Sequence, residues 1–390
     1  MEEINTKTII DEDLYGNGII KENNFVIFVS KALKGETVKY KISNKHKRFA
    51  KAYITDLITQ VDKRCPVNCS AYFKCGSCQY LHLNNEDEKT KKINIINQLF
   101  PDVSLDKVIF NEFSPRNKVT LHVKNNKIGY YEEETNNIIE FNYCELLSKK
   151  MNEIIAELKN NDLNGINKIV IRETYFTKQI MVCFYGNKYI PLEVNSIYLN
   201  DNLIKGRKEI IEEINKLKYV ITPTSFFQTN SLKMISLYDT IKEYAGKGNE
   251  LLDLYCGSAT IGIYLSNNFL NITGVEISKE NIKNAYYNIK LNNISNLKLI
   301  LGDSKLINKG SYDMVIIDPP RNGLSKEVIN NLVKFNKLIY VSCNPQTLKR
   351  DLEKLSEFKI EKFSIIDMFP KTNNIECVVL LTKKVSNENI

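Results

Sequence analysis

The segment NELLDLYCGSATIGIYLS, residues 249–266, contains the pattern that predicts the fold of the C-terminal half. Three leucines between 251 and 254 form an apolar run typical of a buried strand, and a tight loop and a helix follow. Gly257 would let the backbone approach a ligand, and Gly262 would let the helix pack closely. From residue 216 onward strands and helices alternate, which predicts an α/β fold with a parallel, doubly wound sheet.

Acidic residues follow the expected strands of this region. Glu276 ends NITGVEIS, Asp303 lies in LILGDS, and Asp318 follows the strand YDMVII. Parallel strands end at one sheet edge, where open α/β sheets bind ligands, and an acid placed like Glu276 can accept hydrogen bonds from ribose hydroxyls. A dinucleotide-dependent dehydrogenase would fit the loop alone, but the loop lacks a Gly-x-Gly-x-x-Gly motif. Together with Asp253 and Gly257, the set resembles the S-adenosylmethionine site of class I methyltransferases.

Cys343 lies at the end of the next expected strand, in LIYVSCNPQTLKRDL, residues 338–352. A strand-end cysteine is most often a small buried hydrophobe. A methyl donor in the same crevice favours a second interpretation, because a thiolate is a strong nucleophile. Addition of the thiolate to carbon 6 of a pyrimidine would make carbon 5 nucleophilic enough to attack a methyl group.

Such a reaction also needs a base that removes the proton from carbon 5. Glu376 precedes a late apolar strand and is the candidate, and a solvated acid at the strand edge is the alternative. The region around both residues resembles successive motifs of the RNA 5-methyluridine methyltransferase family. The matching segments are TPTSFFQTN at 222–230, DPPRNGL at 318–324, VSCNPQTLKRDL at 341–352 and FPKTNNIECVVLL at 369–381.

The resemblance implies that Cys343 is the nucleophile and Glu376 the proton acceptor. Asn374 stands where the family usually has His, two residues before the base. The resemblance also implies a donor site for S-adenosylmethionine formed by Gln228, Tyr255, Thr260, Glu276, Asp303 and Asp318.

The N-terminal region has short apolar runs separated by turn residues, which predicts a small β-barrel. Residues 31–64 contain ten Lys or Arg and three acids, a balance that suits a phosphate backbone, although a solvated face is the commoner explanation. GNGII and FVSKALKGETV resemble the family's RNA-binding TRAM barrel. The resemblance covers nearly the whole chain and implies a TRAM-like barrel at 1–60, an α+β central domain at 61–215 and a class I methyltransferase domain at 216–390.

Four cysteines gather in CPVNCSAYFKCGSCQYLHL, residues 65–83. Clustered cysteines in a chain without an export signal indicate metal binding, and the second close pair of a zinc ribbon is missing. A Cys-x5-Cys-x2-Cys spacing with a remote fourth Cys fits an iron–sulfur cluster, expected as 4Fe–4S, and resembles the cluster-bearing branch of the family. Cys65 is the alternative first ligand because it carries the Pro that usually follows that ligand. The predicted ligands are Cys69, Cys75, Cys78 and Cys144.

The chain as a whole has no signal peptide pattern and no apolar run of about 18 residues. We therefore expect a cytoplasmic monomer without a membrane partner. Cluster-bearing members of the family commonly act on large-subunit ribosomal RNA, so the resemblance favours 23S ribosomal RNA over transfer RNA as the substrate.

Several other functions are compatible with parts of the sequence. A transfer-RNA uracil-5-methyltransferase is the nearest alternative, and a non-catalytic RNA-binding ribosome-assembly factor would not need Cys343 and Glu376. A 5-methylcytosine enzyme would have a Cys beside the Pro of the Asp-Pro-Pro motif, where none is present. An amino-group methyltransferase typically has an aromatic residue where Arg321 stands, and a redox protein would need an electron-transfer partner motif.

Overall fold

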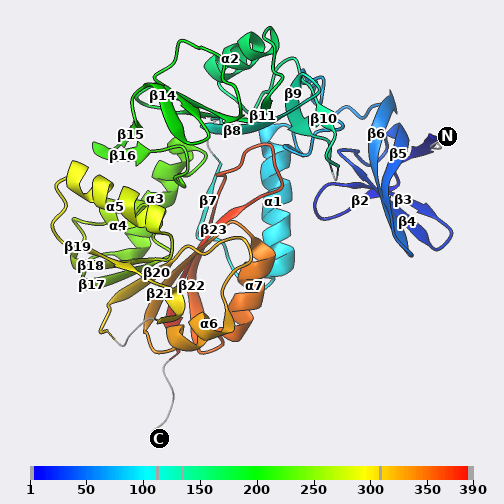
Figure 1. Cartoon of the computed structure of the whole chain (residues 1–390). Helices are drawn as coiled ribbons and strands as arrows, with labels where there is room; N and C mark the ends of the chain where they lie inside the picture. The colour runs from blue at the N-terminus through cyan, green and yellow to red at the C-terminus, as the bar shows by residue number, and fades with distance from the viewer. Residues whose placement is uncertain (1–3, 111–113, 134, 307–309, 385–390) are drawn as a thin grey trace, which may run out of the picture.

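The structure is a computed structural model that describes residues 4–110, 114–133, 135–306 and 310–384. Its N-terminal part is a six-stranded sheet in the order β1-β5-β6-β4-β3-β2, which forms a lobe of its own in Figure 1. In β5, Val38 and Tyr40 are buried between lysines, as the alternating pattern predicts. The strands are β1 (Asn5–Thr8), β2 (Asp11–Glu12), β3 (Gly18–Glu22), β4 (Phe25–Ser30), β5 (Thr37–Lys45) and β6 (Phe49–Thr59).

A segment built of turns, residues 61–83, leads from this sheet to α1 (Asn85–Leu99) and is called the cysteine segment below. A seven-stranded sheet follows, and α2 (Lys149–Lys159) packs apolar side chains against it in the same core as the cysteine segment. Its strands, in spatial order, are β10 (Ile138–Ile139), β9 (Lys127–Tyr131), β8 (Lys118–Lys124), β11 (Ile166–Glu173), β12 (Ile180–Gly186), β13 (Ser196–Leu199) and β14 (Asn202–Gly206).

The C-terminal part is an eight-stranded sheet with a core on each face. A short hairpin, β15 (Ile210–Ile214) and β16 (Leu217–Ile221), precedes it. In spatial order the eight strands are β19 (Leu297–Leu301), β18 (Phe269–Glu276), β17 (Gly248–Leu254), β20 (Met314–Ile317), β21 (Lys337–Ser342), β23 (Glu376–Lys383), β22 (Phe358–Ile366) and β7 (Lys107–Ile109).

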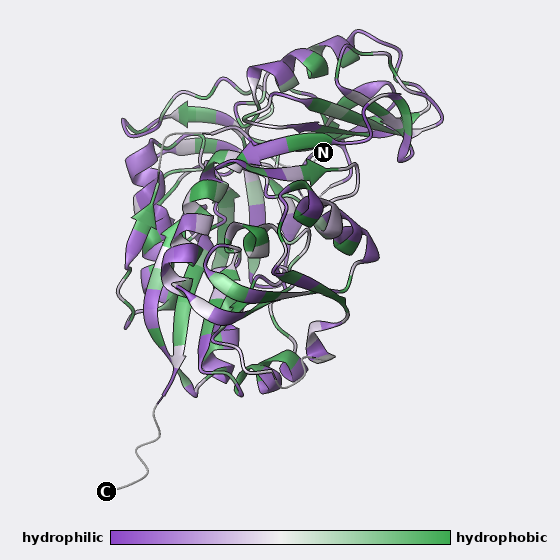
Figure 2. Ribbon diagram, turned by 90° about the vertical axis from the view of Figure 1, so that its left-hand side faces the viewer, coloured by the Kyte–Doolittle hydropathy of each residue, from purple (hydrophilic) through white to green (hydrophobic). Residues whose placement is uncertain are grey.

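Helices cover both faces of the eight-stranded sheet, so the α/β expectation is confirmed. The helices α3 (Ser231–Ala245), α4 (Thr260–Tyr264) and α5 (Lys279–Leu291) contribute to one core. The helices α1, α6 (Lys326–Leu332) and α7 (Pro345–Lys354) contribute to the other, and a short 3-10 helix, η1 (Ser304–Leu306), follows β19. Figure 2 shows apolar residues concentrated along the central strands between these layers.

The sheet is parallel from β19 to β21 and again between β22 and β7, but β23 breaks the fully parallel arrangement that the alternation predicts. β23 runs antiparallel to β21 and β22, because residues 367–375 connect β22 to β23 without a crossover helix. β7 lies in the range expected for the central domain, yet it pairs with β22 and extends the eight-stranded sheet. No helix in the described ranges is long and apolar enough to cross a membrane.

Candidate active site

Five polar residues gather at one edge of the eight-stranded sheet. They are placed by β17, β18, β20, β21 and the first residue of β23, and they are Asp253, Glu276, Asp318, Cys343 and Glu376. Side chains along a strand point alternately to the two faces of the sheet. The pairing registers align all five residues with positions that point to the same face. They therefore share the face that α3, α4 and α5 cover. Strand order reverses between β17 and β20, which is where open α/β sheets form a ligand crevice.

Cys343 and Glu376 face each other across neighbouring strands. Ser342 pairs with Cys377 in the antiparallel register of β21 and β23. Because the two strands run in opposite directions, the next pair in this register is Cys343 and Glu376. Opposed residues of such a pair have Cβ atoms about 4.5–5.5 Å apart. Glu376 is 4% exposed and Cys343 is half-buried. The expected nucleophile and base are thus brought together by strand register.

The electrostatic surroundings favour the protonated form of both groups. Burial raises the pKa of the Cys343 thiol to about 11, with Glu376 and Asp318 adding to the rise and Arg321 opposing it. Burial and the Asp318 carboxyl raise the pKa of Glu376 well above its usual range, and Arg321 again opposes the shift. Desolvation also raises the pKa of Asp318. The positive charge of Arg321 therefore favours a thiolate at Cys343.

Cys343 opens into a cavity of about 150 Å³, called the Cys343 pocket. This pocket is comparable in size to one pyrimidine base. Its wall includes Tyr15 from the N-terminal lobe, Ile95 from α1 and Asn374 from the β22–β23 connection. Tyr15 accepts a hydrogen bond from Gln346, and its carbonyl accepts one from the Tyr80 hydroxyl at 2.9 Å. The sequence contains no local signal for Tyr15, since only the tertiary fold brings the N-terminal lobe to this pocket.

The turn after Cys343 is fixed by its own hydrogen bonds. Asn344 caps α7 by accepting from the N–H groups of Gln346 and Thr347 at 3.1 and 3.5 Å, and Pro345 occupies the first helical turn. The Asn344 amide and the Thr347 hydroxyl also donate to the Arg321 carbonyl at 3.2 and 3.3 Å. These bonds join the motif that carries Cys343 to the motif that carries Asp318.

The loop after β17 has features of a ligand-binding turn. Tyr255, Gly257 and Ala259 all adopt left-handed φ angles near 60°, a conformation that is costly for the two non-glycine residues. Glu276 is held beside this loop and accepts hydrogen bonds from the N–H groups of Gly257 at 3.0 Å and Ser278 at 2.7 Å.

Two buried polar atoms beside this loop have no hydrogen-bond partner in the described part of the chain. One is Oδ1 of Asp253, whose other oxygen accepts from the Gly262 N–H at 3.2 Å, and the second is Oγ of Ser258. Burial and Asp318 raise the pKa of Asp253 to about 8. Unpaired buried polar atoms are rare in folded proteins, and here they suit a polar ligand such as S-adenosylmethionine.

Of the other residues expected in the donor site, Thr260 and Asp303 lie beside the same loop. The Thr260 hydroxyl already forms a hydrogen bond with the Tyr238 hydroxyl, at 2.6 Å. Asp303 accepts from the Lys305 N–H at 2.9 Å. Burial raises the pKa of Tyr255 and the nearby Asp303 carboxyl adds to the rise, so these two are neighbours. Gln228 is half-buried, and its carbonyl accepts from Asn117 at 2.8 Å.

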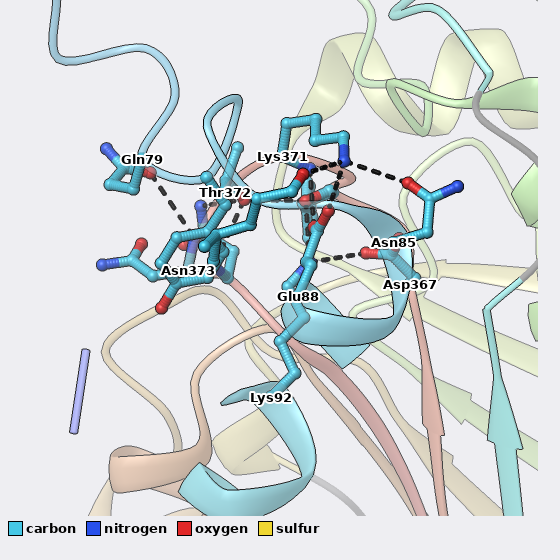
Figure 3. A network of polar contacts seen from close by, with 12 residues as sticks. Gln79, Asn85, Glu88, Lys92, Asp367, Lys371, Thr372 and Asn373 are labelled. Atoms are coloured by element: carbon cyan, nitrogen blue, oxygen red, sulfur yellow. Dashed lines mark hydrogen bonds and ion pairs between the residues drawn. The ribbon is translucent and has the colours of Figure 1, made fainter. Parts of the chain in front are cut away.

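A buried ion network fixes the connection that leads to Glu376 (Figure 3). Lys92 of α1 donates to Glu88 at 2.8 Å and to Asp367 at 2.6 Å. Glu88 also accepts from the N–H of Lys371 at 2.7 Å, and the Lys371 ammonium donates to Asn85 at 2.9 Å. Helix α1 therefore positions the wall of the Cys343 pocket. The pattern of α1 gives no sign of this role, because Asp367 is remote in sequence.

The four cysteines predicted as cluster ligands line one cavity, called the cysteine cavity, together with apolar side chains. They are Cys69, Cys75, Cys78 and Cys144. Cys65 lies outside this lining and donates its N–H to the His82 carbonyl at 2.9 Å. Within the described ranges, no group of three or more His, Cys, Asp or Glu is placed to hold a single metal ion. Thiols around a polynuclear cluster stand farther apart, because iron and sulfide atoms lie between them.

Burial also changes the acidity of the cavity thiols. It raises the pKa of Cys69 to about 11 and shifts the pKa values of Cys78 and Cys144 in the same direction. Lys31 of the N-terminal lobe opposes the shift at Cys78. The Lys31 ammonium is buried and donates to the carbonyls of Tyr72 at 2.7 Å and Cys75 at 2.6 Å.

The chain is similar to known RNA methyltransferases in sequence and in fold. A family described as tRNA (Uracil-5-)-methyltransferase matches residues 192–305 and 301–384. An uncharacterized RNA methyltransferase of Clostridium acetobutylicum is 35% identical over 94% of both chains, and one of Staphylococcus aureus is 29% identical over 98% of both. The crystal structure of Pyrococcus abyssi tRNA (uracil-54, C5)-methyltransferase with S-adenosyl-L-homocysteine is 26% identical, with a TM-score of 0.82, over 97% of this chain and 99% of that one.

Proposed function

Since this chain belongs to the RNA uracil-5-methyltransferase family and is an S-adenosylmethionine-dependent RNA methyltransferase, we propose that it methylates carbon 5 of a uridine in 23S ribosomal RNA. The observation that carries the chemistry is the placement of Cys343 opposite Glu376 at the sheet edge. A thiol and a carboxyl in this arrangement suit addition to a pyrimidine followed by proton removal.

In the proposed reaction, the Cys343 thiolate adds to carbon 6 of the uracil in the Cys343 pocket. The electron pair of the ring double bond moves toward the carbon 4 carbonyl and makes carbon 5 nucleophilic. S-adenosylmethionine supplies the electrophilic methyl group to carbon 5, its sulfur–methyl bond breaks, and S-adenosylhomocysteine is left. Glu376, which must be ionised at this stage, then takes the proton from carbon 5, the ring double bond forms again, and Cys343 leaves as thiolate. Arg321 assists because its positive charge favours the thiolate.

The donor is proposed to bind at the loop after β17. The unpaired atoms of Asp253 and Ser258 and the left-handed loop support this placement. Glu276 would bind the ribose and Asp318 would lie between donor and base. The proposed donor-binding residues are Gln228, Tyr255, Thr260, Glu276, Asp303 and Asp318.

An iron–sulfur cluster of the 4Fe–4S type is proposed for the cysteine cavity. The shared cavity supports Cys69, Cys75, Cys78 and Cys144 as ligands, and the position of Cys65 outside the lining supports Cys69 over Cys65. When bound, such a cluster would hold the cysteine segment to the seven-stranded sheet. The cavity is half lined by apolar side chains, which would shield a cluster from water.

The N-terminal sheet is proposed to be a TRAM-like RNA-binding barrel, in a cytoplasmic, monomeric enzyme. Its basic strands support that role, as does the contact of Tyr15 with the Cys343 pocket. The limits 1–60, 61–215 and 216–390 remain our proposed domains, with β7 contributing to the third.

Transfer RNA is the second candidate substrate, because the similar Pyrococcus abyssi enzyme acts on transfer RNA. The test is to map 5-methyluridine in total RNA from cells with and without the gene. We expect one or more 23S ribosomal positions to lose the modification. Loss in transfer RNA alone would move the substrate to that class, and unchanged 5-methyluridine in all RNA would refute uridine C5 methylation.

A further inference from the structure

A cleft of about 300 Å³ lies between the N-terminal lobe and the cysteine segment, and it is called the aromatic cleft here. Strands β4 and β6 form its floor, Lys74 and Gln79 of the cysteine segment form one wall, and Glu132 and Glu133 after β9 form another. Neither the predicted reaction nor the cysteine cavity uses these residues.

The floor of the aromatic cleft is a sheet face that carries aromatic rings. Parallel pairing sets Phe28 beside Lys51 and Ser30 beside Tyr53, while the residues between them point into the core of the lobe. The rings of Phe28 and Phe49 lie edge to face, with centroids 6.0 Å apart, and His46 is stacked on the Phe49 ring at 4.3 Å, so a base would use the other face of that ring. Partly exposed aromatic rings on a sheet are the surface on which unstacked RNA bases bind.

The cleft also has a hydrogen-bonding group without a partner. Oγ of Ser30 is buried and has no hydrogen-bond partner in the part of the chain that the structure describes. A hydroxyl can donate to a ring nitrogen or carbonyl and accept from an amino group. Placed beside the aromatic floor, it suits the edge of a stacked base.

The charges of the lining favour a base over a phosphate. Three carboxylates, Asp13, Glu132 and Glu133, line the cleft with two lysines, Lys51 and Lys74. Asp13 already accepts hydrogen bonds within its own loop, so Glu132 and Glu133 are the proposed acceptors for a base. Carboxylates repel phosphate and accept hydrogen bonds from the amino groups of adenine, cytosine and guanine. Uracil has no amino group, so it matches this lining less well.

The aromatic cleft adjoins the Cys343 pocket. Asn373 lines both cavities, and its N–H donates to the Gln79 amide oxygen at 3.4 Å. The loop before β3 also serves both, because Asp13 and Asn17 line the cleft whereas Tyr15 lines the pocket. A single RNA strand could therefore place one base in each cavity.

We infer that the aromatic cleft binds an amino-bearing nucleobase from the strand that flanks the target uridine. The inference rests on the proposed function for the identity of that strand. It assigns Phe28 and Phe49 the role of a stacking surface, and it makes the N-terminal lobe a reader of RNA sequence as well as a binder of phosphates.

The test uses a nonanucleotide RNA with a central uridine flanked by adenosines, and the Cys343→Ala full-length protein, so that binding is read without turnover. Each adenosine is removed in turn by an abasic substitution. Because base–aromatic stacking has a known range, one abasic position should weaken binding about five- to hundred-fold. In the Phe49→Leu variant, which keeps an apolar side chain, the abasic substitution at that RNA position should not weaken binding any further. Phe49→Tyr keeps the ring and should behave as the parent protein does.

A second measurement needs no variant of the cleft. Replacing each adenosine by 2-aminopurine should give strong fluorescence quenching at one position, because the stacked base contacts the rings. Uniform quenching, or equal abasic losses with and without the Phe49 ring, would overturn the inference. Stronger binding of a nonauridylate would overturn the preference for amino-bearing bases. Absence of 5-methyluridine formation would instead refute the proposed function, which these binding assays do not measure.

Discussion

Cys343 and Cys69, one thiol of the cysteine cavity, are both half-buried and differ mainly in their neighbours. Burial raises the pKa of both Cys343 and Cys69 to about 11. Around Cys343 stand two carboxyls and the positive charge of Arg321. Around Cys69 stand other thiols, apolar side chains and the Glu145 carboxyl. Burial alone therefore does not identify a reactive cysteine, whereas a base and a cation beside the same thiol do, as Glu376 and Arg321 are beside Cys343.

The contrast predicts different chemistry for the two sites. A single thiolate at Cys343 can be balanced by Arg321 and can attack an organic ring. Several thiolates in the cysteine cavity would repel one another and need a bound cation to neutralise them. The two sites can therefore be separated by variants that affect one and leave the other intact.

The largest effect is expected from Glu376→Gln. The amide cannot take the proton from carbon 5, so turnover should fall about a hundred- to ten-thousand-fold. The methylated RNA should accumulate joined to Cys343, because elimination needs that proton transfer. Single-turnover assays with labelled donor and denaturing gels measure both quantities. Release of product at the parent rate would mean that another group is the base, and iron content should stay unchanged.

The variant Cys75→Ser should change the iron content of the cysteine cavity, which Glu376→Gln leaves unchanged. Anaerobically purified protein should be brown and contain iron and sulfide, and this variant should lose both and melt at a lower temperature. Iron and sulfide analysis with a thermal melt is the measurement. Cys69→Ser should lose more iron than Cys65→Ser, since only Cys69 lines the cavity. A colourless parent protein with one zinc per chain would end the iron–sulfur proposal.

A smaller effect on the same cavity is expected from Lys31→Met. The change leaves the carbonyls of Tyr72 and Cys75 without their buried donor, at a cost of about 1–3 kcal/mol for each unsatisfied group. Denaturant unfolding should show reduced stability, and iron should be lost faster to a chelator. Lys34→Met is the matched control, because the Lys34 side chain is 62% exposed. Equal effects of the two variants would contradict a special role for Lys31.

The smallest effect concerns the acidity of Cys343. Its pKa lies above neutrality and Arg321 opposes the rise, so the single-turnover rate should increase with pH as the thiolate forms. Arg321→Gln removes the positive charge and should raise the pKa further, which moves the rising limb to higher pH. Methyl transfer measured between neutral and alkaline pH tests this shift. An identical profile in the variant would show that Arg321 does not act on the thiol.

Local sequence patterns predicted the parts of the site that depend on strand ends. Glu276, Asp318 and Cys343 each follow a recognisable apolar run, so their arrival at one sheet edge can be expected before the structure is known. The antiparallel direction of β23 is harder to predict, because a strand that follows a hairpin and a strand that follows a crossover helix have the same apolar pattern.

Contacts between distant segments leave no such pattern. Lys92 binds Asp367 across most of the chain, and α1 shows only an ordinary helical sequence. Tyr15 reaches the Cys343 pocket through the placement of a whole lobe. β7 joins the eight-stranded sheet although its sequence neighbours belong elsewhere. Tertiary packing decides all three, and it is not encoded in local periodicity.

The most direct test of the account is trapping with RNA that carries 5-fluorouridine at the target position. Fluorine cannot leave carbon 5 as a proton, so the wild-type enzyme with S-adenosylmethionine should form an adduct that survives denaturation, with peptide mapping placing the bond on Cys343. Cys343→Ala should form no adduct and no methylated product, while Cys183→Ala, a buried cysteine outside both sites, should still be trapped. An adduct in Cys343→Ala, or turnover of the fluorinated RNA without one, would contradict covalent catalysis by Cys343.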